Sequence, residues 1–541
     1  MNRKNGIEEI RNSSKIWDVI IVGGGATGLG VAVDAASRGY TTLLLEQSDF
    51  AKGTSSRSTK LIHGGVRYLQ QGNISLVLEA LRERGLLLQN APHLVRNQAF
   101  IVPNYSWWEA PFYGIGLKLY DMLAGRLGLG MSRLLSRNES LKQIPTLEPE
   151  GLKGGVLYHD GQFDDSRLAL NLAQTAVEYG ATVLNYMEVI SIKKTGGMVG
   201  GVTAMDIEMG EKHEINGRVV VNATGVFAEN VIQMDDPQNG GIICPSQGVH
   251  LVLDKKFLPG QTALMVPRTD DGRVLFAVPW LDKVVVGTTD TAIPESSLEP
   301  RAYDEEIDFI LKHAKRYLTK DPERADVLSV FVGIRPLIKA RDVHNTAKLS
   351  REYVLLTSKS GLLTITGGKW TTYRKMAQDT VNKAAVIARL EKRPCLTEHM
   401  KIHGWLMQVD ESDPLHMYGS DMDDLKKLIN DNPDLGQKLH GELPYTKGEV
   451  VWAVREEMAR TVDDVLSRRT RSLLLNARAS MESAPEVARI MAAEMGFGRK
   501  WEEMQVDKYL ELAKGYLPDH KTYNAAGGTP SECEIKGRVR K

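Results

Sequence analysis

A short buried strand that runs directly into a glycine loop constrains the fold of this chain most. Residues 17–22 (WDVIIV) are rich in β-branched side chains, and the loop GGGATG follows at once at residues 23–28. An apolar periodic stretch over residues 29–37 and a second buried run over residues 41–46 complete a βαβ unit. The sequence therefore predicts an α/β fold whose first unit binds a nucleotide.

The glycines of this loop suit a bound dinucleotide. Gly23 permits the tight turn, Gly25 lets the backbone approach a pyrophosphate, and Gly28 lets the helix pack closely on the strand. The N-terminus of the helix then faces the phosphates. Glu46 ends the second strand about twenty residues on, where a carboxylate accepts a ribose hydroxyl. With strand, loop, helix and acid in register, a dinucleotide site is favoured over a plain structural turn.

Composition favours a multidomain globular protein and excludes several other classes. The 541 residues exceed one compact core, and Lys+Arg and Asp+Glu are equal at 68 each. Without a long basic block, a nucleic-acid partner is not expected. Cys244, Cys395 and Cys533 form no C-x-x-C pair, so we expect no disulfide framework, no metal site and a reducing, cytoplasmic compartment. No apolar run reaches the roughly 20 residues that span a bilayer.

Two later segments distinguish FAD from NAD. The buried strand at residues 219–222 ends in Ala223-Thr224-Gly225, which suits a second close approach to the nucleotide. The strand at residues 362–366 leads into GGKWTT at 367–372 and an amphipathic helix. A reduced flavin carries negative charge near N1 and the C2 carbonyl, and the N–H groups of a helix N-terminus stabilise that charge. The alternative of a nicotinamide-dependent dehydrogenase does not explain this segment. The alternative of a flavoprotein that modifies nucleic acid requires a long basic surface, which this sequence does not predict.

Further strands and a helical region follow from the apolar patterns. Buried strands are predicted at residues 218–222, 283–287, 353–357 and 362–366, and residues 249–253 form an alternating run. After about residue 395 helical periodicity takes over, and one long apolar helix face is predicted through Val450, Val454, Met458, Val462 and Leu466. We expect residues 395–520 to form a helical domain and residues 521–541 a tail.

Longer motifs extend over nearly the whole chain, at residues 21–25, 54–56, 60–69, 222–225, 287–290, 333–337 and 367–375. The combination of HGG-x-RYL, GTTD, G-x-RPL and GGK-x-TTYRK is much more specific than any one of these motifs. It resembles the FAD-dependent glycerol-3-phosphate dehydrogenases of the membrane-associated aerobic type. Residues 463–470 (DDVLSRRT) resemble the C-terminal cap of that family.

The resemblance implies an α/β architecture with a Rossmann-like FAD-binding domain of the glutathione-reductase and D-amino-acid-oxidase type. An α+β substrate domain is then interleaved with it over residues 1–394, followed by the helical C-terminal domain. FAD-binding segments are expected at about 16–90, 150–230 and 335–392, and substrate segments at about 91–149 and 231–334. The implied reaction oxidises sn-glycerol 3-phosphate to dihydroxyacetone phosphate, with hydride passing from C2 to flavin N5 and electrons then to a membrane quinone. An oxidase that uses oxygen, or another FAD-dependent 2-hydroxy-compound dehydrogenase, is the alternative.

The same motifs supply candidate site residues. A phosphate dianion needs converging cations, and the substrate-binding candidates are Arg67, Tyr68, Arg335, Arg351 and Lys369. A base must take the C2 hydroxyl proton, and the candidates are His63 first and His250 second, with Arg335 beside them; either histidine could instead orient the substrate. The expected FAD contacts are Gly23, Gly25, Ala26, Thr27, Gly28, Glu46, Thr54, Ser55, Ser56, Ala223, Thr224, Gly225, Gly368, Lys369, Trp370 and Thr371.

An aromatic segment at residues 105–120 bears on the electron acceptor. It holds two of the eight tryptophans beside Phe112, Tyr113 and Tyr120. Such clusters suit a bilayer interface and equally suit a packed interdomain core, which we expect for most of them. Contact with a membrane quinone therefore follows from the resemblance, which implies a peripheral enzyme on the inner face of the cell membrane. The sequence leaves open whether the chain forms a homodimer.

Overall fold

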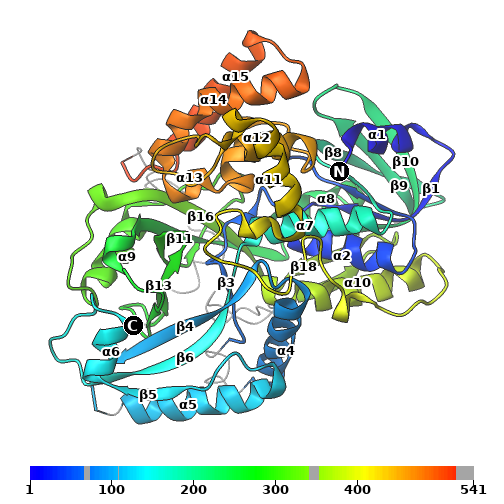
Figure 1. The fold of residues 1–541 in the computed structure, drawn as a ribbon. Helices are drawn as coiled ribbons and strands as arrows, with labels where there is room; N and C mark the ends of the chain where they lie inside the picture. The colour runs from blue at the N-terminus through cyan, green and yellow to red at the C-terminus, as the bar shows by residue number, and fades with distance from the viewer. Residues whose placement is uncertain (66–72, 108, 340–352, 520–541) are drawn as a thin grey trace.

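The computed structural model describes residues 1–65, 73–107, 109–339 and 353–519, and Figure 1 shows their arrangement. Two large β-sheets carry helices on their outer faces. A group of C-terminal helices, orange in Figure 1, lies above both sheets.

The first sheet grows from the predicted βαβ unit. Its order is β17–β18–β10–β1–β2–β7, the strands from β18 to β7 run parallel, and β9 and β8 extend it antiparallel from the first half of β10. Strands lie where the sequence predicts them at 17–22, 41–46, 218–222, 353–357 and 362–366. The bounds are β1 Ile16–Val22, β2 Thr42–Leu45, β7 Thr182–Leu184, β8 Met187–Thr195, β9 Met198–Asp206, β10 Lys212–Asn222, β17 Tyr353–Thr357 and β18 Leu363–Gly367.

Both faces of this sheet are buried, which explains why its strands read as continuous apolar runs. Along β1, Val19 and Ile21 pack on one side, whereas Ile20 and Val22 pack on the other. The first side is covered by α2 (Ala26–Ser37), α7 (Asp165–Glu178) and α10 (Tyr373–Ile387), which lie together in Figure 1. On the second side lie α1 (Arg3–Arg11) and α8 (Ala228–Asp235).

The second sheet has the order β15–β11–β14–β13–β12–β4–β6–β3, with β16 paired to β11 and β5 to β6. It takes in β3 and β6, which lie inside the ranges expected for the FAD-binding segments, so the two parts alternate along the chain more finely than expected. Its strands are β3 Leu61–Ile62, β4 Val95–Asn104, β5 Arg133–Ser136, β6 Gly154–Phe163, β11 Ile243–Asp254, β12 Ala263–Val266, β13 Leu275–Trp280, β14 Lys283–Gly287, β15 Thr291–Ala292 and β16 Val327–Ile338. The helices beside it are α4 Ile74–Asn90, α5 Glu109–Ala124, α6 Arg137–Gln143 and α9 Asp304–Lys315.

The C-terminal region packs on the back of this second sheet. Trp280 of β13 and Phe331 of β16 are buried in one core with Leu473 and Ala488 of the helical region. The helices are α11 Met422–Asp431, α12 Lys447–Arg455, a π-helix Asp464–Arg469, α13 Ser472–Leu475, α14 Ala477–Met495 and α15 Arg499–Lys514.

The prediction of one long apolar helix from Val450 to Leu466 is wrong. Helix α12 ends at Arg455, and Met458 adopts φ +56°, which an α-helix cannot contain. The buried ion pair between Glu457 and Arg167 of α7 holds the chain at this break. Val450, Met458 and Val462 are nevertheless buried, because they reach the core from separate segments.

A charged histidine joins α7 to the start of the helical region. His403 bonds Glu178 through Nδ1 and Asp421 through Nε2, the latter over 2.8 Å. Burial alone lowers the pKa of His403, but the two carboxylates outweigh burial and raise its pKa to about 9, from an ordinary value of 6.5.

This ion pair predicts a pH-dependent stability. The charged His403 stabilises the fold fully below pH 6.5, and this contribution is lost as the pH rises through about 9. Because Glu178 is half exposed, we expect His403→Gln to lower the free energy of unfolding by roughly 1–2 kcal/mol at pH 6 and by much less at pH 10. Urea unfolding followed by circular dichroism measures the difference, and an equal loss at both pH values would contradict this prediction.

Candidate functional site

A cavity of about 670 Å³ lies where the carboxyl ends of β1, β2, β10 and β18 face the second sheet. Such an edge is the usual ligand position in a parallel α/β sheet. Its first wall comes from the glycine loop and the residues after each of these strands. Its second wall comes from β4, β6, β11, β13 and β16, so residues far apart in sequence meet around one space.

The floor of the cavity is backbone that admits no side chains. Gly23 has φ +109°, and a Cβ atom there would lie 2.7 Å from the carbonyl oxygen of Ala223. A Cβ atom at Gly28 would lie 1.9 Å from the carbonyl oxygen of Gly23, so the start of α2 packs directly on the loop. Helix α2 begins at Ala26, whose N–H donates to Ser55 Oγ over 2.9 Å. The helix N-terminus is thus held at the cavity, as a phosphate site requires.

Glu46 is fixed at the end of the cavity that β2 forms. Its Oε2 accepts the N–H of Gly24 over 2.6 Å, and its Oε1 accepts the N–H of Ser48 over 2.8 Å. Burial raises the pKa of Glu46, against the opposing effect of these two hydrogen bonds. The carboxylate lines the cavity and contacts the glycine loop at Gly24, at the position where the sequence predicts a ribose acceptor.

The segment after β18 closes the cavity from the other end of the chain. Gly367 and Gly368 have φ +84° and +72°, and they turn the backbone from β18 toward α10. Trp370 Nε1 then donates to the carbonyl of Ser55 over 2.9 Å. The two glycine segments are therefore tied together, and their backbone walls, helix terminus and fixed carboxylate fit FAD.

Most of the predicted FAD contacts line this cavity. The two exceptions are Gly28, which lies under the loop as a packing position, and Ser56, which is buried against the carbonyl of Gly53. The members that line it are Gly23, Gly25, Ala26, Thr27, Glu46, Thr54, Ser55, Ala223, Thr224, Gly225, Gly368, Lys369, Trp370 and Thr371. Three substrate-binding candidates, Arg67, Tyr68 and Arg351, lie outside the described residues.

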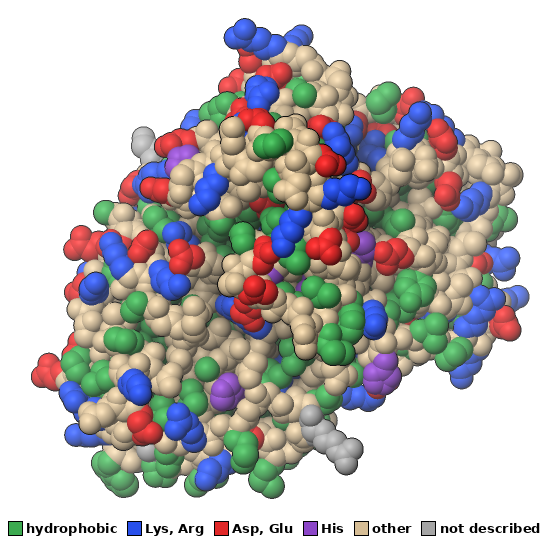
Figure 2. All heavy atoms as spheres, viewed as in Figure 1, with side chains coloured by type: hydrophobic (Ala, Val, Ile, Leu, Met, Phe, Trp, Pro, Cys, Tyr) green, Lys and Arg blue, Asp and Glu red, His purple; other side chains and the backbone are tan. Residues whose placement is uncertain are grey.

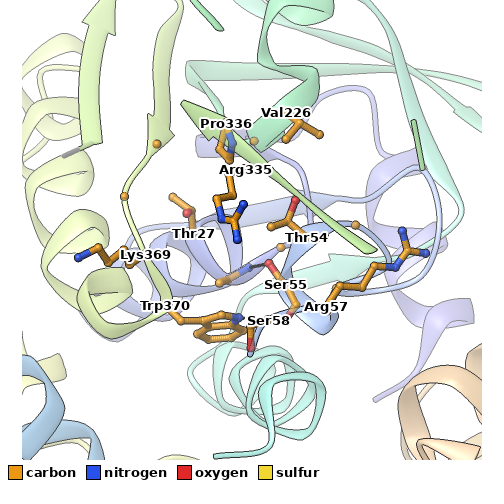
Figure 3. Close-up of a pocket in the computed structure, with 18 of the residues that line it drawn as sticks. Thr27, Thr54, Ser55, Arg57, Ser58, Val226, Arg335, Pro336, Lys369 and Trp370 are labelled. Atoms are coloured by element: carbon orange, nitrogen blue, oxygen red, sulfur yellow. Dashed lines mark hydrogen bonds between the residues drawn. The ribbon is translucent and has the colours of Figure 1, made fainter. Parts of the chain in front are cut away.

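Arg335 extends from β16 into the cavity, and Figure 3 shows its guanidinium between Thr27 and Thr54. Asp290 lies 3.2 Å from its Nη1, and its Nη2 donates to the carbonyl of Thr289 over 3.1 Å. Nη2 also donates to Thr288 Oγ1 over 3.2 Å, and these partners fix the orientation of the guanidinium. The Lys369 side chain points away from Arg335 in Figure 3, so the expected convergence of these two cations is not seen.

Both candidate histidines line the cavity, in different settings. His250 is buried, its Nε2 lies 2.9 Å from Thr59 Oγ1, and its ring stacks on Phe331 with centroids 4.7 Å apart. Burial first, and then the charges of Arg335 and Lys60, lower the pKa of His250 well below its ordinary 6.5. His250 is therefore neutral near pH 7. His63 is half-buried, at the end of β3.

Sequence patterns did not point to three other residues on the cavity wall. Asp160 and Tyr158 come from β6, and Arg273 comes from the turn before β13, where its Nε lies 3.3 Å from Asp271. Nothing in their local sequence distinguishes them from ordinary strand and turn residues. The pairing of β6 with β4 and β3 brings Asp160 and Tyr158 to the site.

Comparisons with known proteins bear on the fold and on the cofactor. Residues 18–374 match the protein-family model described as FAD dependent oxidoreductase, and residues 359–503 match that of the C-terminal domain of alpha-glycerophosphate oxidase. The chain is 40% identical to the mitochondrial glycerol-3-phosphate dehydrogenase of Bos taurus, over 95% of this chain and 75% of that protein. It is 36% identical to the mitochondrial enzyme of that name from Schizosaccharomyces pombe, over 95% and 89%.

A solved structure is also similar over nearly its full length. The glycerol-3-phosphate dehydrogenase of Bacillus halodurans, complexed with FAD, aligns with a TM-score of 0.78 and 30% identity, over 96% of this chain and 99% of that one. The fold class and the FAD cofactor predicted from the sequence are thereby confirmed. The chain belongs to the family of FAD-dependent glycerol-3-phosphate dehydrogenases.

Proposed function

We propose that this chain oxidises sn-glycerol 3-phosphate to dihydroxyacetone phosphate and passes the electrons to a membrane quinone. The observation that carries the proposal is the arrangement of the cavity. The glycine loop at residues 23–28 and the segment at residues 367–371, together called the FAD cradle, face two histidines and Arg335 across it. Relatives that match most of the chain carry the name glycerol-3-phosphate dehydrogenase.

Different side chains of the cavity bind the substrate, remove its proton and orient it. Arg335, whose guanidinium is held in the cavity by Asp290 and Thr289, binds a substrate oxygen. His63 takes the C2 hydroxyl proton as general base. His250, held neutral by burial, orients the substrate together with Thr59. FAD, when bound, supplies the hydride acceptor.

The outer face of α5 supports a membrane-bound acceptor. Phe112, Ile115, Leu119 and Met122 follow one another at helical spacing and are exposed, Ile115 by 72% and Met122 by 77%. Trp107 just before the helix is 83% exposed. Trp107 and Phe112 are thus outside the interdomain core that the sequence predicts for most of these aromatic residues, whereas Tyr120 is buried.

This face has the chemistry of a bilayer contact. Figure 2 shows hydrophobic side chains along the lower edge of the molecule, where Figure 1 has α5 and β5. The exposed Lys118 and Arg133 flank the apolar residues, which suits anionic headgroups. Among the described residues, no helix combines the length and apolarity that crossing a membrane requires. The proposed contact is therefore peripheral.

Oxygen is the second candidate acceptor. The C-terminal region, over residues 359–503, matches a family model named for alpha-glycerophosphate oxidase. Because this match concerns the helical region and not the flavin cavity, it favours neither acceptor by itself.

Anaerobic addition of glycerol 3-phosphate to the purified yellow protein tests the substrate. We expect the flavin absorbance to bleach, since the cavity holds the base and the anion-binding arginine beside the cofactor. Dithionite bleaching of the same sample is the control for intact flavin. A flavin that dithionite bleaches and glycerol 3-phosphate does not would remove the substrate assignment while sparing the cofactor.

The acceptor and the membrane contact are tested on the same protein. We expect reoxidation by a soluble quinone to be faster than by air, and co-sedimentation with vesicles that contain anionic lipid. Fast peroxide production in air with slow quinone reduction would favour the oxidase. Protein that stays in the supernatant with every vesicle would remove the membrane contact.

A further inference from the structure

The peptide unit that joins His63 to Gly64 is held from both sides. Its carbonyl, on His63, accepts a hydrogen bond from Thr371 Oγ1 over 3.4 Å. Its N–H, on Gly64, donates to the hydroxyl of Tyr120 over 2.7 Å. The first partner belongs to the FAD cradle and the second to α5, so two distant segments fix the backbone from which His63 enters the cavity.

The hydroxyl of Tyr120 is itself locked in place. Tyr120 is buried on the inner face of α5 and donates to the carboxylate of Asp160 over 2.9 Å. Arg84 of α4 forms an ion pair with that carboxylate, with 2.6 Å between Arg84 Nη1 and Asp160 Oδ1. Burial, followed by the charge of Asp160, raises the pKa of Tyr120 well above 10, so the hydroxyl keeps its proton. The protonated hydroxyl therefore donates its hydrogen bond to Asp160, and its oxygen accepts the N–H of Gly64.

Gly64 packs so closely on α4 and α5 that a side chain has no room there. A Cβ atom at Gly64 would lie 2.4 Å from Leu81 Cδ2 and 2.6 Å from the Tyr120 hydroxyl oxygen. Tyr120 and Leu81 pack together with Val77 in a small buried cluster. The backbone at Gly64 thus rests directly on α4 and α5.

We propose that Tyr120 is a positioning residue for the oxidation, holding the peptide between His63 and Gly64 so that His63 stays in the cavity. Tyr120 acts through His63 and does not line the cavity itself. The inference rests on the proposed function for the role of His63 as base. It adds that the hydroxyl, and not only the ring, is required.

Tyr120→Phe in the FAD-loaded protein tests this role. The ring keeps its packing, so we expect unchanged FAD content and a KM for glycerol 3-phosphate within about twofold. We expect kcat to fall by roughly 10- to 100-fold, because a small misplacement of a reacting group is costly. Hydrogen exchange at the Gly64 amide, followed by mass spectrometry, should become at least about tenfold faster. A loss that came from general unfolding would instead change FAD content and exchange throughout the sheet.

Tyr113→Phe is the matched control, on the same helix and partly buried in a neighbouring cluster. It should leave both kcat and the Gly64 amide unchanged. If Tyr120→Phe does not fold, Arg84→Lys is the second variant: it keeps the charge beside Asp160 but loses the planar guanidinium whose Nη1 lies 3.5 Å from the Tyr120 hydroxyl. It should shift that hydroxyl and lower kcat more than it changes KM, with a smaller loss than Tyr120→Phe. Wild-type kcat in Tyr120→Phe, or an unaltered Gly64 amide, overturns the inference. If glycerol 3-phosphate does not bleach the flavin of the wild-type protein, the proposed function is wrong instead. The exchange rate of the Gly64 amide then still shows whether Tyr120 holds the loop.

Discussion

Replacing His63 by glutamine is expected to lower kcat by about two to four orders of magnitude, the usual contribution of a general base. Glutamine can still hydrogen-bond the C2 hydroxyl but cannot take its proton, so KM should change little. Stopped-flow bleaching of the flavin by glycerol 3-phosphate under anaerobic conditions measures the step directly. Dithionite should still bleach the variant fully, since the backbone of this segment and the FAD cradle are unaltered.

His250→Gln is the comparison that separates the two histidines. His250 Nε2 is engaged by Thr59, and the ring is stacked on Phe331, so we expect this side chain to orient the substrate. Glutamine keeps one hydrogen bond to Thr59, and the expected loss of kcat is about tenfold or less, the value of one neutral hydrogen bond. A large loss in His250→Gln with near-normal His63→Gln would reverse the assignment.

Local sequence could predict the parts of the site that depend on short-range backbone geometry. The loop from Gly23 to Gly28 was predictable because a strand, a tight turn and a helix start within a few residues leave few alternatives. The turn at Gly367 was predictable for the same reason. The alternation of Val19 and Ile20 between two cores explains why the first sheet reads as continuous apolar runs.

The parts that depend on tertiary packing could not be predicted. Tyr120 and Gly64 are 56 positions apart, and nothing near either residue in the sequence marks their hydrogen bond. The helix predicted through Met458 failed because apolar periodicity records burial and not continuity. Met458 is buried as its pattern requires, but the ion pair of Glu457 with Arg167 fixes a break at that point.

Asp49→Asn is expected to lower the free energy of unfolding by about 3–5 kcal/mol, the usual loss when one partner of a buried ion pair is removed. Asp49 is buried, and its Oδ2 accepts from Arg468 Nε over 2.5 Å while its Oδ1 accepts from Arg469 over 2.9 Å. Burial raises the pKa of Asp49, but the two arginines outweigh burial and hold the pKa below 3.8. The variant would leave two buried guanidinium groups with less negative charge between them.

The position of Asp49 links the stability of the fold to FAD binding. Asp49 follows Glu46, at the flavin cavity, whereas Arg468 and Arg469 belong to the helical C-terminal region. Asp49→Asn should therefore weaken FAD binding as well, which release of flavin fluorescence on dilution measures. Asp282→Asn is the matched control, because Asp282 is 74% exposed beside Lys255, and its loss should stay below about 1 kcal/mol. Equal small losses in both variants, with unchanged FAD affinity, would mean that the helical region does not hold the cofactor loop.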